Sequence, residues 1–266
     1  MPQAPQTLNT FEALNQIISA LRGPDGCPWD NEQTHRSLTS YAIEEVFEMV
    51  EAIESGDDQH MCEELGDVLF QVILHAAMAK ERNAFDIFDV INGINSKVVR
   101  RHPHVFADKK VSGSAEVLKN WDEIKKLEKK DSKIKSTKVI NVPEALPALQ
   151  RAYKIGEKTE KLKFDWSETS QVLAQLKAEM VELEEVIPSQ DEKKIQHEIG
   201  DVLFSAAQLA RHLDVEPESA LREANRRFLA RFEKMFDLRK CSVEEFVKLS
   251  SEAKENLWKM VKKMTG

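Results

Sequence analysis

A short acidic segment occurs twice in this chain, and the repetition limits what the chain can fold into. The first copy reads EELGDVLF from residue 63, and the second reads HEIGDVLF from residue 197. Another acidic segment precedes each copy at the same distance, AIEEVFEMVEAI before the first and LKAEMVELEEVI before the second. A long period with only two copies indicates a duplicated domain rather than a solenoid of many short units.

The apolar residues in these segments predict a pair of helices in each repeat. In the first repeat, apolar side chains recur at helical spacing over residues 46–53 and again over 65–73. The sequence SGDD at 55–58, between the two helical patterns, has the composition of a turn. Two helices joined by a short loop pack antiparallel, so residues equally far from the turn lie at the same height.

This geometry predicts that acidic side chains meet across each helix pair. Glu48 and Glu64 lie equally far from Gly56, and two further acids flank them symmetrically. The second repeat has the same symmetry about Gln190. On each helix the acids are spaced i, i+3 and therefore share a face. The expected clusters are Glu45, Glu48, Glu64 and Asp67 in repeat one, and Glu179, Glu182, Glu198 and Asp201 in repeat two.

Carboxylates this close repel one another or take up protons unless a cation compensates their charge. Oxygen ligands without His or Cys favour Mg²⁺ or Mn²⁺ over Zn²⁺. The alternative is a solvated acidic face, which is common in a chain with 32% charged residues. A solvated face is the better explanation for a single acidic pair. Two pairs at matching heights, repeated in both halves, favour a metal site instead. A glycine within a helix lowers helix stability by about 1 kcal/mol relative to alanine. The presence of Gly66 and Gly200 would be explained either by a close approach of another helix or by ordinary small-residue packing.

Basic residues follow each acidic cluster and predict contacts with a polyphosphate. Metal ions bridge phosphate oxygens while Lys and Arg neutralise the remaining charge. The alternative is surface ion pairs with the acidic helices, which contribute little stability. A Trp in a loop usually caps the local core, but in a nucleotide-binding protein it can lie against a base. The expected substrate-binding residues are Trp29, Asn95, Lys97, Arg101, Lys154, Lys158, Trp166, Asn225, Arg227 and Arg231.

Composition indicates an all-α protein. Only nine Gly and nine Pro occur, and alternating strand-like runs are absent. A net charge of −8 argues against a general nucleic-acid or membrane-surface protein. Because no signal peptide or long apolar stretch is found, we expect a cytoplasmic protein without nucleic-acid or membrane partners. The three cysteines, Cys27, Cys62 and Cys241, suggest neither a disulfide framework nor a zinc site.

The length of 266 residues suits two domains. We expect an N-terminal domain over 1–128, a Lys-rich linker over 129–142 and a C-terminal domain over 143–266. A Gly/Pro loop is expected over 22–37, and an amphipathic helix over 242–264 that packs against the domain or forms a dimer contact.

With these motifs identified, the sequence resembles the MazG family of nucleoside triphosphate pyrophosphohydrolases in its two-domain bacterial form. The matching text is GCPWDNEQTHRSL, EEVFE, EELGDVLFQV and KVVRRHPHVF in the first half, and VPEALPALQRAYKI, FDW, HEIGDVLF, LARHL and NRRFLARF in the second. The resemblance covers nearly the whole chain. It implies two tandem all-α domains, homodimers whose helices complete each other's bundles, and Mg²⁺-dependent cleavage of NTP or dNTP to the monophosphate and pyrophosphate.

The family's metal-binding pattern is EExxE followed by ExxD. Repeat one has the complete pattern beginning at Glu44, whereas repeat two has Ala178 at the leading position. Because the C-terminal repeat is usually the active one in tandem members, the resemblance implies catalysis at the repeat-two cluster and leaves repeat one open. Bound Mg²⁺ would activate a water for attack on the α-phosphorus, or a carboxylate such as Glu182 would act as general base. Nucleotide-pool house-cleaning is the expected role.

Two other classes of protein are compatible with parts of the pattern. A di-iron helical bundle requires ExxH on its helices, but Asp67 and Asp201 occupy the position of that His. A helical dimerisation or regulatory protein with a vestigial metal site would use the acidic segments only to orient partners. Failure of Mg²⁺ to change thermal stability would favour this non-enzymatic alternative.

Overall fold

The computed structural model describes residues 2–131 and 138–265. Every regular element within these ranges is a helix, which confirms the predicted all-α class. The chain divides into two compact units, Met1–Lys133 and Ile134–Gly266. Helix α7 continues to Asp131, into the predicted linker over 129–142, and residues 132–137 of that linker lie outside the described part of the chain. The predicted domain limits stay predictions.

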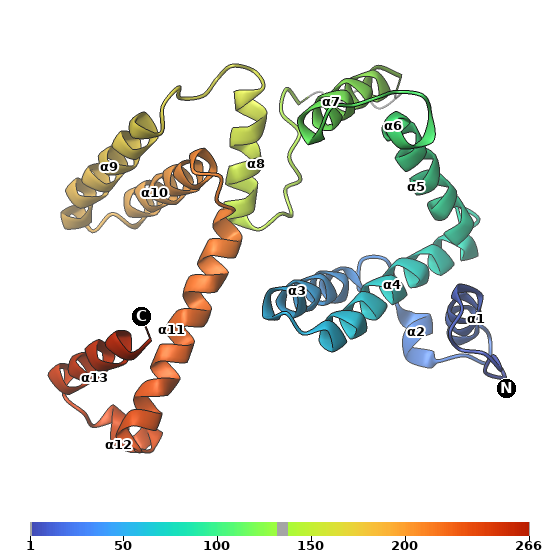
Figure 1. Cartoon of the computed structure of the whole chain (residues 1–266). Helices are drawn as coiled ribbons and strands as arrows, with labels where there is room; N and C mark the ends of the chain where they lie inside the picture. The colour runs from blue at the N-terminus through green and yellow to red at the C-terminus, as the bar shows by residue number, and fades with distance from the viewer. Residues whose placement is uncertain (1, 132–137, 266) are drawn as a thin grey trace. The chain divides into compact units, whose positions relative to one another are not determined.

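The first unit is built around a helical hairpin (Figure 1). Its turn contains Gly56, whose φ of +75° is in the left-handed region that glycine adopts without strain. Asp57 then accepts hydrogen bonds from two backbone N–H groups and begins the second helix. The elements are α1 (Phe11–Leu21), α2 (Pro28–Glu32), α3 (Thr39–Ser55), α4 (Asp58–Glu81), α5 (Ile87–Arg101), α6 (Pro103–Phe106) and α7 (Ser114–Asp131).

The second unit repeats the hairpin with a different turn. Here Gln190 takes the left-handed conformation, with a φ of 54°, and Asp191 caps the following helix. A long helix then leaves the hairpin, packs against the first and last helices of the unit and turns back through a short one (Figure 1). The elements are α8 (Ala148–Glu160), α9 (Thr169–Val186), η1 (Ile187–Ser189), α10 (Glu192–His212), α11 (Pro217–Arg239), α12 (Val243–Val247) and α13 (Ser251–Met264).

Each unit has a buried apolar cluster. In the first unit Ile18, Leu38, Ile73 and Leu74 are almost completely buried where α1 packs against the later half of α4. In the second unit Met235, Phe246, Leu257 and Val261 close the junction of α11, α12 and α13. These clusters fix the ends of the long helices.

Two predicted elements differ from the structure. The loop expected over 22–37 contains the short helix α2, which Pro28 begins at a position where proline's fixed φ is favourable. The helix expected over 242–264 is two helices. Ser250 interrupts it, because its side chain accepts a hydrogen bond from the N–H of Ala253 at 3.2 Å and caps α13.

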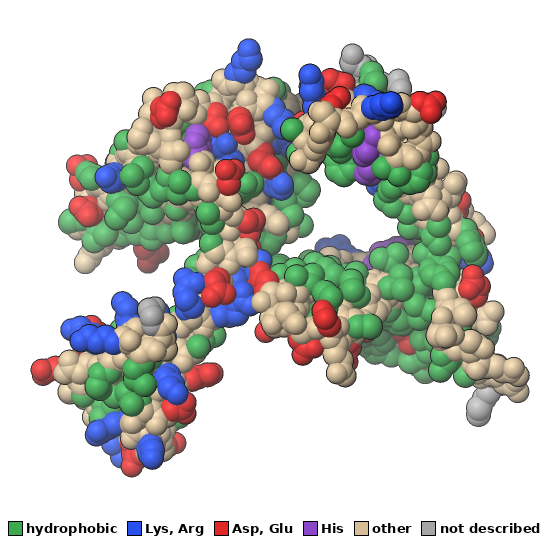
Figure 2. Space-filling view, viewed as in Figure 1, with side chains coloured by type: hydrophobic (Ala, Val, Ile, Leu, Met, Phe, Trp, Pro, Cys, Tyr) green, Lys and Arg blue, Asp and Glu red, His purple; other side chains and the backbone are tan. Residues whose placement is uncertain are grey.

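Many apolar side chains of both hairpins are exposed to solvent when the single chain is considered (Figure 2). The exposed side chains are Ile43, Val46, Phe47, Leu65, Leu69 and Val72 on α3 and α4, and Leu173, Met180, Val181, Ile199, Leu203 and Phe204 on α9 and α10. Apolar faces of this extent usually contact another protein surface. None of the helices in the described part of the chain combines the length and apolarity needed to cross a bilayer.

Candidate metal centre

Three carboxylates meet across each hairpin. In the first unit Glu45 and Glu48 project from α3 and Glu64 from α4, and one oxygen from each lies within 4.8 Å of the others. In the second unit Glu179, Glu182 and Glu198 form the matching group from α9 and α10, again within 4.8 Å. The antiparallel helices and symmetric turns therefore bring these acids to one height in both repeats.

The fourth predicted acid of each repeat lies outside the group of three. The charge of Asp67 nevertheless raises the pKa of Glu45 and of Glu48, so Asp67 is close enough to interact. Asp201 contacts His197, with 3.4 Å between Oδ2 and Nε2. Asp67 is thus a neighbour of its cluster, and the role of both aspartates as ligands stays a prediction.

The repeat-one cluster contains a buried carboxylate oxygen without a partner. Glu64 is only 7% exposed, and its Oε2 accepts no hydrogen bond from the described residues. Its Oε1 lies 3.0 Å from Nε2 of His60. Burial, and then the neighbouring carboxylates, raise the pKa of Glu45 and Glu48. An orphaned oxygen among repelling acids fits an oxygen-seeking cation such as Mg²⁺.

The repeat-two cluster is more accessible. Glu198 is half-buried, whereas its counterpart Glu64 is buried. Gln175 Nε2 donates a hydrogen bond to Glu179 Oε1 at 2.7 Å and so orients that carboxylate. Greater access suits a site that exchanges substrate and product.

The two glycines beside the clusters do not mark a close helix approach. A Cβ added at Gly66 or Gly200 would meet nothing within 4 Å. The explanation that these glycines admit a neighbouring helix therefore fails within the chain.

Several predicted phosphate-binding residues contact other residues of the chain, on another helix or on their own. Arg101 and Arg100 pair with Glu128 of α7 at 2.5 and 2.6 Å, and these guanidinium groups lower the pKa of Glu128 to about 2. On α11, Arg227 lies 3.3 Å from Glu223, and Arg231 Nε donates to the hydroxyl of Thr265 at 3.0 Å.

The other polar and basic residues predicted to bind substrate lie on α5, α8 and α11. Lys154 pairs with Glu157 at 2.7 Å, and Lys158 is half-buried on the same helix. Asn95, Lys97 and Asn225 are exposed. Their contact with phosphate stays a prediction.

The two predicted base-contacting rings are partly exposed. Trp29 is 49% exposed and meets Tyr41 edge to face, with ring centroids 5.9 Å apart. Trp166 is 37% exposed, and its backbone N–H donates to Asp165. Neither ring is committed to a buried core.

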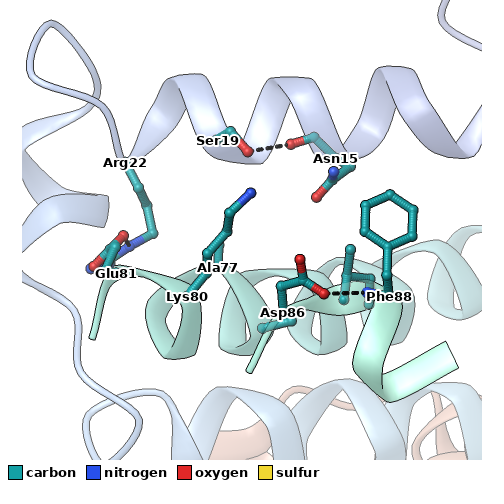
Figure 3. Close-up of a pocket in the computed structure, with 10 residues that line it drawn as sticks. Asn15, Ser19, Arg22, Ala77, Lys80, Glu81, Asp86 and Phe88 are labelled. Carbon is teal, nitrogen blue, oxygen red and sulfur yellow. Dashed lines mark hydrogen bonds and ion pairs between the residues drawn. The ribbon is translucent and has the colours of Figure 1, made fainter. Parts of the chain in front are cut away.

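Figure 3 shows a pocket in the first unit that the metal prediction does not involve. It lies between α1, the end of α4 and the start of α5, with Lys80 and Phe88 among its lining residues. At one side Arg22 donates to Glu81. Asp86 at the other side caps α5.

Sequence analysis missed a polar network in the second unit. Arg211 near the end of α10 donates to Asp165 in the loop before α9, with 2.6 Å between Nη2 and Oδ1. His212 Nε2 lies 3.2 Å from the same oxygen. The FDW and LARHL motifs carry these residues, but only the fold shows that they meet.

Comparison of the sequence with known proteins identifies relatives of this chain. The family model described as MazG nucleotide pyrophosphohydrolase domain matches residues 33–106 and 167–236, which include both acidic clusters. A Thermotoga maritima protein named nucleoside triphosphate pyrophosphohydrolase/pyrophosphatase MazG is 46% identical over 228 residues, covering 86% of this chain and 86% of that protein. The Escherichia coli K12 nucleoside triphosphate pyrophosphohydrolase is 38% identical over 261 residues, covering 96% and 98%. Bacillus subtilis YabN, named an uncharacterized protein, is 44% identical over 255 residues and extends well beyond this chain, which covers 52% of it.

Proposed function

The chain belongs to the MazG nucleotide pyrophosphohydrolase family, and on that premise we propose that it hydrolyses nucleoside triphosphates to monophosphates and pyrophosphate in a Mg²⁺-dependent reaction. The observation that carries this proposal is the meeting of Glu179, Glu182 and Glu198 within 4.8 Å across the α9–α10 hairpin. Relatives named for this activity cover most of the chain.

The repeat-two residues suit a hard divalent cation. Glu179, Glu182 and Glu198 would hold it, and Asp201 would complete an all-oxygen ligand set. Mg²⁺, when bound, lowers the pKa of a water molecule and stabilises charge on a phosphoryl group. Mn²⁺ has the same ligand preference and is an expected substitute.

The protein's own groups would orient the substrate and accept a proton. Glu182 is the exposed member of the cluster and, as an alternative to holding the cation, is our candidate acceptor for the proton of the attacking water. The water oxygen forms a bond to the α-phosphorus while the bond from that phosphorus to the bridging oxygen breaks, and pyrophosphate leaves with the electron pair. Lys154, Lys158 and Arg227 would neutralise the phosphates.

The other predicted polar and aromatic residues would complete substrate binding. Asn225 and Arg231 would contact phosphate oxygens, and Trp166 would contact the base. The residues in the first repeat with matching types, Asn95, Lys97, Arg101 and Trp29, would serve that repeat if it also binds a nucleotide.

Removal of two repeat-two acids tests the catalytic assignment. In the variant Glu182→Ala/Asp201→Ala, pyrophosphate release from NTP should fall by at least about a hundredfold, since a proposed metal ligand and the candidate proton acceptor are lost together. The measurement is product analysis by ion-exchange chromatography with Mg²⁺ present. The matched variant Glu48→Ala/Asp67→Ala removes the corresponding acids from repeat one and should retain most turnover. Full turnover in the first variant would disprove catalysis at repeat two.

We further propose that the enzyme is a homodimer that removes aberrant nucleotides from the cellular pool. The exposed apolar faces of α3–α4 and α9–α10 support association. A comparison of kcat/KM for canonical and modified triphosphates tests the cellular role. Equal values across all substrates would argue against selective clearance.

The exposed apolar faces are also compatible with a second function, that of a helical dimerisation or regulatory protein. A regulatory helical protein would use them for binding and would retain the carboxylates without metal. In that case Mg²⁺ would not raise the melting temperature, whereas a metal-binding enzyme is stabilised by mass action.

A further inference from the structure

A buried arginine closes the open end of the α9–α10 hairpin. Arg211 lies in the last turn of α10, and its side chain is 7% exposed. Its guanidinium donates to Asp165 of the α8–α9 loop at 2.6 Å and to Glu160, the last residue of α8, at 3.3 Å. One side chain thus joins three consecutive segments of the second unit.

The surrounding residues hold this arginine in one orientation. Gln208 accepts from Arg211 Nε at 3.0 Å and donates through its own Nε2 to the carbonyl oxygen of Ala152 on α8 at 2.8 Å. A Cβ at Gly156 would overlap both Gln208 and Arg211, so only glycine lets α8 approach α10 this closely.

Asp165 is the anionic centre of the network. It accepts from Arg211, from His212 and from the backbone N–H of Trp166 at 3.0 Å. Burial opposes its ionisation, but these hydrogen bonds outweigh that effect and hold the pKa of Asp165 below its usual value. The loop that leads into α9 is therefore tied to α10 through a buried ionic contact.

The first unit makes the same connection with the charges reversed. Arg22, which ends α1, donates to both carboxylate oxygens of Glu81 at 2.5 and 2.7 Å, and Glu81 is the last residue of α4 (Figure 3). Arg22 also donates to the carbonyl oxygen of Asp30 in the segment that follows α1, at 2.5 Å. In both repeats an arginine joins the end of the first helix, the segment after it and the end of the second hairpin helix. The arginine lies on the first helix in one repeat and on the hairpin in the other.

This connection matters for metal binding because the ligands lie on two helices. The turn at 187–191 joins α9 to α10 at one end only, and Glu179, Glu182 and Glu198 depend on the register of the two helices. A functional metal site must hold its ligands to within about 0.5 Å. We propose that Arg211, acting through Asp165 and Glu160, is a positioning residue for the repeat-two metal site. This proposal rests on the metal site of the proposed function.

Metal binding by the full-length protein tests the proposal directly. Isothermal titration with Mn²⁺ should use a Glu48→Gln/Glu64→Gln background, so that the repeat-two site is measured. In that background Arg211→Met should raise the Kd for Mn²⁺ about tenfold, the lower range for loss of a residue that orients metal ligands. Arg211→Lys should give an intermediate Kd, because an ammonium retains the charge but cannot replace the guanidinium fork.

Arg22→Met is the matched control, since it breaks the corresponding connection in the other repeat. It should lower the melting temperature without changing the Kd for Mn²⁺. An unchanged Kd in Arg211→Met, or an equal rise in Arg22→Met, would show that Arg211 acts only on stability and would overturn the proposal. If Arg211→Met does not fold, Asp165→Asn provides the same comparison with little change in shape.

The titration separates this proposal from the proposed activity. If the unmodified protein releases no pyrophosphate, the proposed function fails, while the Kd values still decide the role of Arg211. If the background protein binds no Mn²⁺, the positioning role is also overturned.

Discussion

Glu64 is the residue whose surroundings point most directly to a cation. Its carboxylate is buried in the first hairpin, and one oxygen has no hydrogen-bond donor among the described residues. Leaving a buried acceptor unsatisfied costs about 1–3 kcal/mol. A bound divalent ion would remove this cost and the repulsion from Glu45 and Glu48 at the same time.

Glu64→Gln should therefore separate metal binding from folding. Without metal, the variant should be more stable than the original protein by about 1 kcal/mol, because a charge is removed and an amide donor is added. Mg²⁺ should then raise its melting temperature less than it raises that of the original protein. Urea unfolding and thermal unfolding, each with Mg²⁺ and with EDTA, give both values. A less stable metal-free variant with an unchanged Mg²⁺ response would contradict a cation at Glu64.

The sequence was sufficient to place three acids of each cluster at one height. Equal distances from the turn determine that placement, since the rise per residue of a helix is constant. The Arg211–Asp165 contact was not predictable in this way, because nothing local relates the end of α10 to the loop before α9. The close contact of α8 with α10 at Gly156 was not predictable for the same reason. The close helix approach suggested for Gly66 and Gly200 is absent within the described part of the chain.

At the scale of helices, the packing of α8 against α10 depends on a glycine. Gly156 faces Gln208 and Arg211, and a methyl group at this position would overlap both side chains. The space beside Gly66 in α4 is open, although that residue is also within a helix. The two glycines therefore have opposite roles in stability.

Gly156→Ala should destabilise the protein by about 1–3 kcal/mol, the usual cost of overpacking a close contact. Gly66→Ala should instead stabilise it by up to about 1 kcal/mol, because alanine has the higher helix propensity. Urea denaturation of the two variants measures both free energies of unfolding. If Gly156→Ala instead stabilised the protein, α8 would have to move away from α10 without lowering the free energy of unfolding.

Turn and cap chemistry explains which elements were predictable. The hairpin helices have apolar periodicity, left-handed turn residues and Asp caps, so their existence and approximate ends follow from sequence. The break before α13 depends on a single serine, and apolar periodicity continues through it. Helix α2 has only five residues, little more than one turn, and is too short for apolar periodicity to detect.

At the scale of the whole molecule, the proposed dimer would cover the exposed apolar faces of the two hairpins. Leu203 on α10 is 51% exposed and lies on such a face. A second copy of the chain would bury it, as expected for a homodimer.

Leu203→Asp should shift the protein from dimer to monomer, because association would bury an unpaired carboxylate. Light scattering coupled to size-exclusion chromatography measures the mass. Val243→Asp on α12 is the control, since Val243 is 62% exposed but lies away from the hairpin face. It should leave the mass unchanged. A monomeric original protein, or a Leu203→Asp variant that still dimerises, would contradict association through this face.

The opposite polarity of the two arginine connections has a consequence for the history of the duplication. Exchange of α1 and α8 between the repeats would place Arg22 beside Arg211 at one junction and Glu160 beside Glu81 at the other. Both junctions would then join like charges, so an exchange limited to the first helix would be penalised. Each repeat therefore depends on the first helix whose charge matches its own hairpin.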